Sequence, residues 1–261
     1  MTDIRSKVYE IYSLEQLASG NSAVHTLHPL VKIISTLVYV ICVISFDRYA
    51  LFALAPYSFY PFVVMAMADI PSSLVFRRAL LALPFALFAG LSNLLFDPMI
   101  SHGLISFLAI LLRTMLCVSA VLILVAVTPF SELTAQLRRL HLPAVLVILL
   151  EMTYRYIGTL LGEASSMFTA YQLRSRNKSG LAIRHMGSFV GFLLIRSFDR
   201  AERVYNAMKC RGYPKWQHGE AGKRLKAADY GFLAIVGGLS LLFRFADVVN
   251  LFSGWLEELV T

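Results

Sequence analysis

The sequence predicts an all-α membrane protein with about five transmembrane helices and a cytoplasmic helical domain that contains two long crossing helices. Apolar residues make up 57% of the 261 residues, and the mean hydropathy is +0.66. Only 15% of the residues are charged, whereas soluble domains contain about 25%. The apolar residues lie in runs of about twenty, the length that a helix needs to cross a bilayer. A basic, segmented stretch separates the last run from the others.

Five apolar runs are expected to span the membrane. A polar arm, residues 1–28, precedes the first run without a short cleavable apolar segment, so we expect insertion without loss of a signal peptide. Four runs lie within residues 29–127 and one within residues 228–261. In order, the runs cover 29–46, 49–68, 74–96, 103–127 and about 230–251, with Pro56 and Pro61 inside the second and Pro84 inside the third.

The distribution of basic residues predicts the orientation, because Lys and Arg are retained on the cytoplasmic side. Residues 128–227 carry 16 of the 24 Lys and Arg residues but only six acidic residues. Arg77 and Arg78 mark the second loop as cytoplasmic, whereas the loop 97–102 has no Lys or Arg. The N-terminus is therefore expected inside and the C-terminus outside. The apolar patch 189–198 is too short to cross the membrane, and we expect it to pack on other helices.

Two long helices are predicted within the basic stretch. A short helix stops before Pro143, and residues 144 to about 176 then contain no proline, which predicts a helix of about 50 Å at 1.5 Å per residue. The second long helix lies within the stretch 187–214. It is expected to end at Gly212, because glycine suits a left-handed helix cap and Pro214 prevents the helix from resuming.

Each long helix ends near an arginine and contains a pair of glycines four residues apart. Arg174 and Arg211 present a fixed fork of donors that can bind a carboxylate through two hydrogen bonds, which suits a partner-binding role. The residues alone favour the alternative, in which the two arginines only complement the negative end of a helix dipole. Small residues four apart allow two helix backbones to approach closely. This spacing predicts that the helices cross at Gly158 and Gly162 of one and Gly187 and Gly191 of the other.

Other polar residues offer little for catalysis or metal binding. His25 and His28 could bind a metal if their segment is helical, but no carboxylate or cysteine lies nearby, and we expect them to be solvated. Arg113 lies in the middle of an apolar run, where it is expected to face a neighbouring helix or a partner subunit, or to form an ion pair. Glu151 and Arg155, four residues apart, are expected to form an ion pair.

The absence of three sequence motifs argues against several enzyme classes. The chain has no G-x-x-x-x-G-K-[ST] phosphate-binding motif, no G-x-S-x-G and no H-E-x-x-H. Three cysteines are too few and too scattered for a disulfide framework, so reduced thiols are expected. They are Cys42, Cys117 and Cys210.

Several segments together resemble a known family. They are N-S-A-V-H-T-L-H-P-L-V-K, T-P-F-S-E-L-T-A-Q-L-R-R-L-H-L-P, E-M-T-Y-R-Y and R-S-F-D-R-A-E-R-V-Y-N-A-M-K-C-R-G-Y. Over nearly the whole chain, the sequence resembles the transmembrane T component of energy-coupling factor (ECF) transporters. The first segment is similar to the cobalt-type branch of that family, CbiQ.

The resemblance implies a role for each helix end. In that family two long cytoplasmic helices cross, and their Ala-Arg-Gly-like ends dock into grooves on two ATPase subunits. Arg211 and Gly212 match the second of these motifs, with Cys210 in place of alanine. Leu173, Arg174 and Ser175 stand where the first motif belongs, and they keep its arginine but lack its alanine and glycine.

The resemblance also implies the partners and the setting. The chain would lie in a bacterial or archaeal cell membrane and bind two CbiO-like ATPase subunits, which hold the ATP and Mg. It would move a CbiM-like substrate-binding membrane subunit, alone or together with a small CbiN-like subunit. Cobalt is the implied substrate, with nickel or a vitamin as alternatives. No cofactor in this chain and no nucleic-acid partner are expected.

Two other classes of function compete with this coupling role. An intramembrane enzyme could use Glu151, Arg155 and the histidines, but it would need clustered polar residues within the spans, which are nearly devoid of them. An autonomous carrier would usually show inverted repeats and helices broken at the membrane midplane, and we find neither pattern. The sequence therefore favours the coupling subunit.

Overall fold

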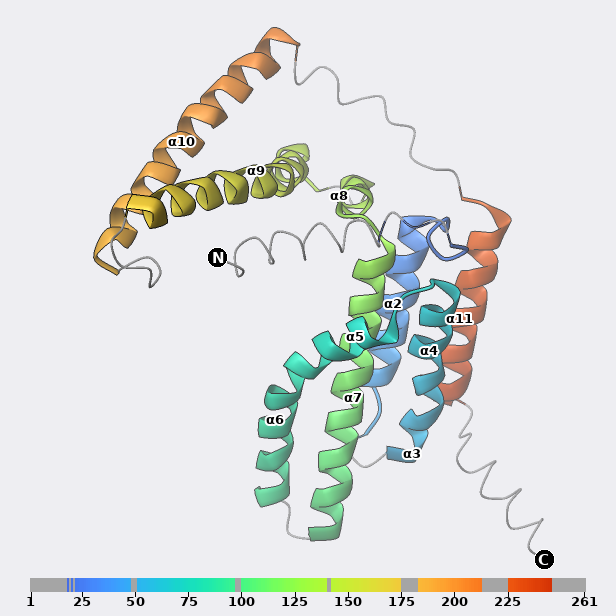
Figure 1. Cartoon of the computed structure of the whole chain (residues 1–261). Coiled ribbons are helices and arrows are strands. Elements are labelled where there is room, and N and C mark those ends of the chain that lie inside the picture. Colours follow the sequence, from blue (N-terminus) through green and yellow to red (C-terminus); the bar gives the residue numbers. More distant parts are fainter. Residues whose placement is uncertain are drawn as a thin grey trace, which may run out of the picture. The chain divides into compact units, whose positions relative to one another are not determined.

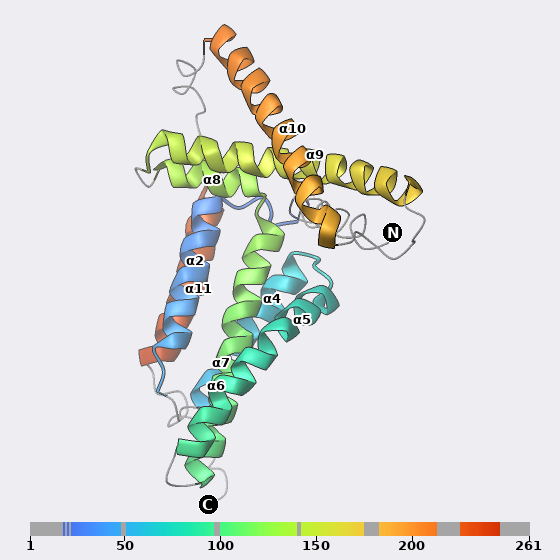
Figure 2. The same cartoon turned by 90° about the vertical axis from the view of Figure 1, so that its left-hand side faces the viewer.

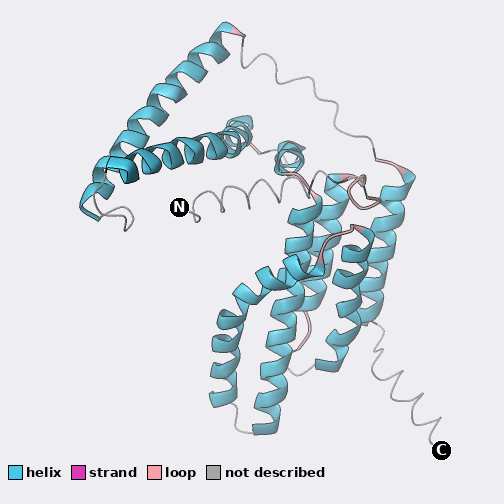
Figure 3. Ribbon diagram, viewed as in Figure 1, coloured by secondary structure: helices cyan, strands magenta, loops and turns pink. Residues whose placement is uncertain are grey.

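The computed structural model describes residues 18, 20, 22–47, 51–96, 100–139, 142–174, 183–212 and 225–245. All regular secondary structure in these residues is helical (Figure 3). The chain divides into two compact units, which are described separately below. Unit 1 comprises Met1–Ser13 and Leu137–Lys223, and unit 2 comprises Leu14–Gln136 and Arg224–Thr261.

Unit 2 contains all five predicted apolar runs, and Figure 1 shows its helices. Its first long helix, α2 (Pro29–Ile44), begins at the expected residue because His28 caps it. The His28 ring nitrogen Nδ1 accepts the backbone N–H of Leu30 at 3.2 Å, and Pro29 fills a first-turn position where no N–H is needed. The other helices are α3 (Leu51–Leu54), η1 (Ala55–Ser58), α4 (Phe59–Met67), α5 (Ser72–Ala79), η2 (Leu80–Ala82), α6 (Leu83–Phe96), α7 (Ile100–Val127) and α11 (Ala227–Phe245). The helix α8 (Phe130–Arg139) begins in unit 2 and passes into unit 1 after Gln136.

Prolines divide two of the predicted runs. Pro56 lies in the 3-10 segment η1, between α3 and α4, and Pro84 is the second residue of α6, directly after η2. Proline lacks a backbone N–H and its ring clashes with the preceding turn, so it interrupts an α-helix. The second and third runs are therefore segmented rather than continuous helices.

The helix α7 is central to unit 2, because it contacts α2, α3, α4, α5 and α6, while α2 also packs along α11. Figure 2 shows α6 beside α7 and α2 beside α11. Two clusters of buried apolar side chains form the core. One includes Val24, Val64, Val75 and Val127, and the other includes Tyr39, Tyr57, Leu116 and Ala120.

Polar contacts at the end of α2 explain Arg113, for which the sequence left three alternatives. Its guanidinium donates to the carbonyl oxygens of Phe46, at 2.7 Å, and Asp47, at 3.0 Å. Arg244 of α11 donates to the carbonyl oxygen of Ser45 at 3.1 Å and lies over the Phe46 ring. Arg113 therefore joins α7 to the residues that follow α2.

The contacts of α2 fix the directions of three helices. The start of α2 meets the end of α7 through Lys32 and Val127, and its end meets Arg113, so the two helices are antiparallel. His28 contacts Asp229 and Ser45 contacts Arg244, so α2 and α11 are parallel. These directions agree with the alternation that the five predicted spans require.

Four helical segments are long and apolar enough to cross a membrane by length and composition: Ser72–Asn93, Gly103–Val127, Val145–Arg174 and Ala227–Phe245. Three of them match predicted spans, and the shorter apolar helix Pro29–Ile44 matches another. Together with the helical content, they confirm an all-α, multi-pass membrane protein. The third segment belongs to the stretch that the sequence analysis places in the cytoplasm, so apolar composition alone does not separate that helix from the spans.

Unit 1 contains the two predicted long helices, α9 (Ala144–Arg174) and α10 (Ile183–Cys210) (Figure 1). They have 31 and 28 residues. The start of α9 follows Pro143, whose carbonyl oxygen accepts the N–H of Leu146 at 2.9 Å. The two helices contact each other within this unit.

Candidate partner-binding site

The end of α10 has the cap that the sequence predicts. Gly212 has a φ of +74°, which lies in the left-handed region that favours glycine. Its N–H donates to the carbonyl oxygen of Lys209 at 3.0 Å, and the N–H of Arg211 donates to Met208 at 3.1 Å. These bonds use carbonyls that the last helical turn leaves open. Cys210, Arg211 and Gly212 are all exposed, so the helix presents its arginine at a fixed, accessible end.

The end of α9 presents the other arginine. Arg174 is the last residue of the helix and is exposed, and the side chain of Leu173 is 83% exposed. Ser175, the third residue of the predicted motif, lies outside the described residues. Both predicted arginines therefore stand at exposed helix ends within unit 1.

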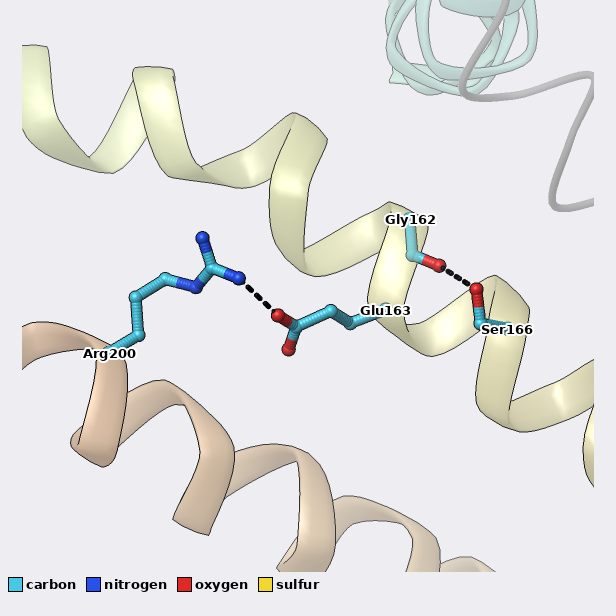
Figure 4. Close-up of polar contacts among 4 residues, drawn as sticks. All are labelled: Gly162, Glu163, Ser166 and Arg200. Atoms are coloured by element: carbon cyan, nitrogen blue, oxygen red, sulfur yellow. Dashed lines mark hydrogen bonds and ion pairs between the residues drawn. The ribbon is translucent and has the colours of Figure 1, made fainter.

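An ion pair joins α9 to α10. The Arg200 guanidinium of α10 donates to a carboxylate oxygen of Glu163 on α9 (Figure 4). The two side chains are 34% and 22% exposed, respectively. Within the described residues, the Nε of Arg200 and the second oxygen of Glu163 have no hydrogen-bond partner, so the pair makes a single hydrogen bond. Near the start of α10, the Tyr171 hydroxyl and the His185 ring form a second polar contact at 3.0 Å.

An apolar groove of about 370 Å³ lies beside this ion pair. It is lined by Leu149, Met152, Tyr156 and Leu160 of α9 and by Ala201, Val204 and Met208 of α10. The two helices thus share a cleft rather than a continuous close-packed seam.

The glycines do not make the helix contact that the spacing predicts. A Cβ atom added to Gly162, Gly187 or Gly191 would meet no atom within 4 Å. Close backbone packing would place atoms of the other helix within that range, so the prediction is wrong for these three residues. Gly158 is half-buried on α9, and its role stays a prediction. Side chains from neighbouring turns, above all Glu163 and Arg200, connect the helices instead.

The apolar first half of α10 also differs from expectation. The patch 189–198 is expected to pack on other helices, but most of its large apolar side chains are exposed. Val190, Phe192, Leu194, Ile195 and Phe198 are 48% to 67% exposed. Contiguous apolar surface of this kind marks contact with a partner or a membrane. The sequence pattern identified the patch correctly but not its environment.

The two N-terminal histidines are buried, which corrects the expectation that they are solvated. His25 is 8% exposed and its ring contacts the Ser22 hydroxyl at 2.7 Å, while His28 is 2% exposed and caps α2. Among the described residues, no group of three or more His, Cys, Asp or Glu side chains could hold a metal ion. The predicted pair of Glu151 and Arg155, both on α9, stays a prediction.

Sequence reasoning missed a buried polar cluster in unit 2. Lys32 and Asp229, 3% exposed each, lie in it with His28. Their positions near the starts of apolar helices were visible in the sequence. However, one lysine and one aspartate about 200 residues apart carry no pairing signal, and only the fold brings their elements together.

These features define the class of protein: a multi-pass, all-α membrane protein with an exposed pair of long helices that end in arginines. A family model described as "Cobalt transport protein", CbiQ, matches residues 18–220. The chain belongs to this family, the EcfT/CbiQ family of ECF transporter transmembrane components. Members of the family are membrane components of transporters and not catalytic subunits.

Individual relatives agree with the family assignment. The energy-coupling factor transporter transmembrane protein EcfT of Ruminiclostridium cellulolyticum is 25% identical over 88% of this chain and 94% of its own length. The nickel permease LarQ of Lactiplantibacillus plantarum is 30% identical over 45% of this chain and 43% of its own length. An uncharacterized protein of Methanocaldococcus jannaschii is 29% identical over 54% of this chain, and the chain spans half of that relative's length.

Proposed function

We propose that this chain is the coupling subunit of an ECF-type importer, which transmits conformational change from two ATPase subunits to a separate substrate-binding membrane subunit. The observation that carries the proposal is the pair of exposed arginines, Arg174 and Arg211, at the ends of two long helices in a member of this family. One chain with two such ends suits a complex with two ATPase subunits.

The chemistry of the helix ends supports docking. Arginine is always charged and presents several N–H donors in a rigid plane, so it can bind carboxylate or carbonyl oxygens of a partner in one defined geometry. Gly212 leaves the surface beside Arg211 without a side chain, which permits a close approach of the partner. A groove on an ATPase subunit that offers such oxygens would hold the helix end without a large interface.

The exposed apolar surface of α9 and α10 supports contact with a further partner. A membrane subunit that moves relative to this chain needs an apolar face on which to rest, and the first half of α10 offers one. The Glu163–Arg200 ion pair would keep the two helices at a defined angle while their ends are bound. Movement of the ATPase subunits would then change the position of this surface.

The proposed substrate is the cobalt ion. The family description supports cobalt, and the nickel permease among the relatives makes nickel the first alternative. A vitamin substrate would be the second. Recognition of the substrate would belong to the CbiM-like membrane subunit, and ATP and Mg would be bound by the CbiO-like subunits rather than by this chain.

The proposed function requires the helix ends to lie in the cytoplasm, where ATP is available, and cysteine labelling tests this. Cys210 is native and exposed beside Arg211. In a variant with Cys42 and Cys117 replaced by alanine, an impermeant maleimide added to intact cells is expected to leave Cys210 unlabelled and to label it after permeabilisation. An added Asp47→Cys change, at the opposite end of α2 from the polar arm, is expected to react from outside.

The opposite labelling pattern would overturn the orientation and the docking role together. Labelling of Cys210 in intact cells would also result if α9 crossed the membrane, which its apolar composition permits. The experiment therefore distinguishes a cytoplasmic α9–α10 pair from a sixth span.

A further inference from the structure

The strongest unassigned feature is the buried polar cluster of unit 2, formed by His28, Lys32 and Asp229 with the carbonyl oxygen of Val127. It lies at the end of α7 and at the start of α11. After α7 ends at Val127 the chain continues into α8 and unit 1, and it comes back to unit 2 just before α11. All contacts described below lie within unit 2.

Lys32 binds the end of α7. Its ammonium Nζ donates to the carbonyl oxygen of Val127 at 3.0 Å and to that of His25 at 3.0 Å. Val127 is the last residue of α7, so its carbonyl has no partner within the helix and lies at the negative end of the helix dipole. These two bonds hold the end of α7 beside the segment 25–32.

Asp229 binds the point of return. One carboxylate oxygen accepts the N–H of His28 at 2.8 Å, and the other accepts the N–H of Lys226 at 2.7 Å. Asp229 lies in the first turn of α11, where a negative charge is favoured. The carboxylate of Asp229 therefore binds both Lys226, the residue just before α11, and His28, the cap of α2.

Both attachments are made by the same short segment. Residues 25–32 reach α7 through Lys32 and α11 through the backbone of His28, and this segment includes the first turn of α2. Burying an ammonium and a carboxylate costs free energy unless their hydrogen bonds are made. Apolar residues would fill the space at less cost, so the bonds have a positional role: they fix two chain connections to one helix start.

We infer that Lys32 and Asp229 are positioning residues that tie two of the connections between unit 1 and the membrane bundle, those at the end of α7 and at the start of α11, to the start of α2. This inference rests on the proposed function, in which unit 1 binds the ATPase subunits. With both connections held, a displacement of either one moves the segment 25–32 and α2. Without them, the same displacement is absorbed in the connections and does not reach α2.

The test follows a spectroscopic reporter two residues before that segment, in the full complex with its ATPase subunits. A spin label at position 23, where the native alanine is exposed, is read with and without Mg-ATP. The wild-type signal is expected to change with nucleotide. In Lys32→Met and, separately, Asp229→Asn, we expect the ATPase subunits to co-purify and to hydrolyse ATP as in the wild type, while most of the nucleotide-dependent change is lost.

Two matched controls isolate the cluster. Arg77→Met removes an exposed cation from unit 2, and Asp69→Asn makes the same change as Asp229→Asn at an exposed residue. Both are expected to keep the nucleotide-dependent signal. A purely structural role would lower the amount of complex and its ATPase activity together, without a selective loss of the signal.

Three results would overturn the inference. The first is a nucleotide-dependent signal that is preserved in both cluster variants. The second is a wild-type label whose signal does not change with nucleotide although the ATPase subunits are bound. The third is failure of both variants to accumulate. Failure of the wild-type chain to bind any ATPase subunit is a different result, because it rejects the proposed function itself.

Discussion

Reversal of the charge at Arg211 is expected to abolish assembly with the ATPase subunits while the protein still inserts into the membrane. Loss of a desolvated, hydrogen-bonded charge at an interface costs about 2–5 kcal/mol, and repulsion by the new carboxylate adds to it. The dissociation constant should therefore rise at least about thirtyfold for Arg211→Glu. The measurement is the amount of ATPase that co-purifies, normalised to the chain in the membrane.

Two variants control this experiment. Arg184→Glu makes the same change at an exposed residue near the start of α10, and it should co-purify the ATPase subunits as the wild type does. Arg211→Lys keeps the charge but loses the planar fork, so an intermediate result is expected. Wild-type binding by Arg211→Glu would show that the end of α10 is not a docking site.

Reversal of either charge in the Glu163–Arg200 pair is expected to give the second large effect, a loss of uptake. Arg200→Glu places two carboxylates where one ion pair joins α9 to α10, and Glu163→Arg places two guanidinium groups there. Direct juxtaposition of like charges costs several kcal/mol where solvent is excluded, and less at this partly exposed site. Each single variant should lower metal uptake by about tenfold, because the two helix ends no longer fit two ATPase grooves at once.

The double variant, Glu163→Arg with Arg200→Glu, restores opposite charges and should recover most of the uptake. Asp199→Arg, one residue away on the exposed side of α10, is the control for a general effect of charge. If the double variant were as defective as the singles, the charges would act on something other than each other. Uptake is normalised to the protein in the membrane in every case.

Local patterns allowed the helix ends to be predicted. The left-handed Gly212 follows from a glycine after a proline-free helix, with Pro214 beyond it. The all-α membrane class follows from composition and run length. Such features depend on residues close together in the sequence, and a single chain is enough to read them.

Features that depend on distant residues were predicted poorly. His28 was expected to be solvated because no carboxylate or cysteine lies nearby in the sequence, whereas its backbone N–H donates to Asp229, 201 residues away. The glycine spacing gave a crossing point, but whether a small residue faces another helix depends on the rotation of both helices. Gly162 and Gly187 face open space, and the adjacent Glu163 makes the contact instead. The exposed patch of α10 could not be recognised as exposed, because its environment depends on tertiary packing and on partners.

The central claim, that both long helices end on ATPase subunits, is tested most directly by photo-crosslinking in the membrane. A photoreactive phenylalanine analogue replaces Leu173 in one variant and Cys210 in another, which leaves Arg174 and Arg211 in place. A third variant carries it at Phe59, an exposed residue of α4 in unit 2. We predict adducts with an ATPase subunit from positions 173 and 210 and none from position 59. Absence of ATPase adducts from both helix ends, in cells where the complex is assembled, would contradict the account.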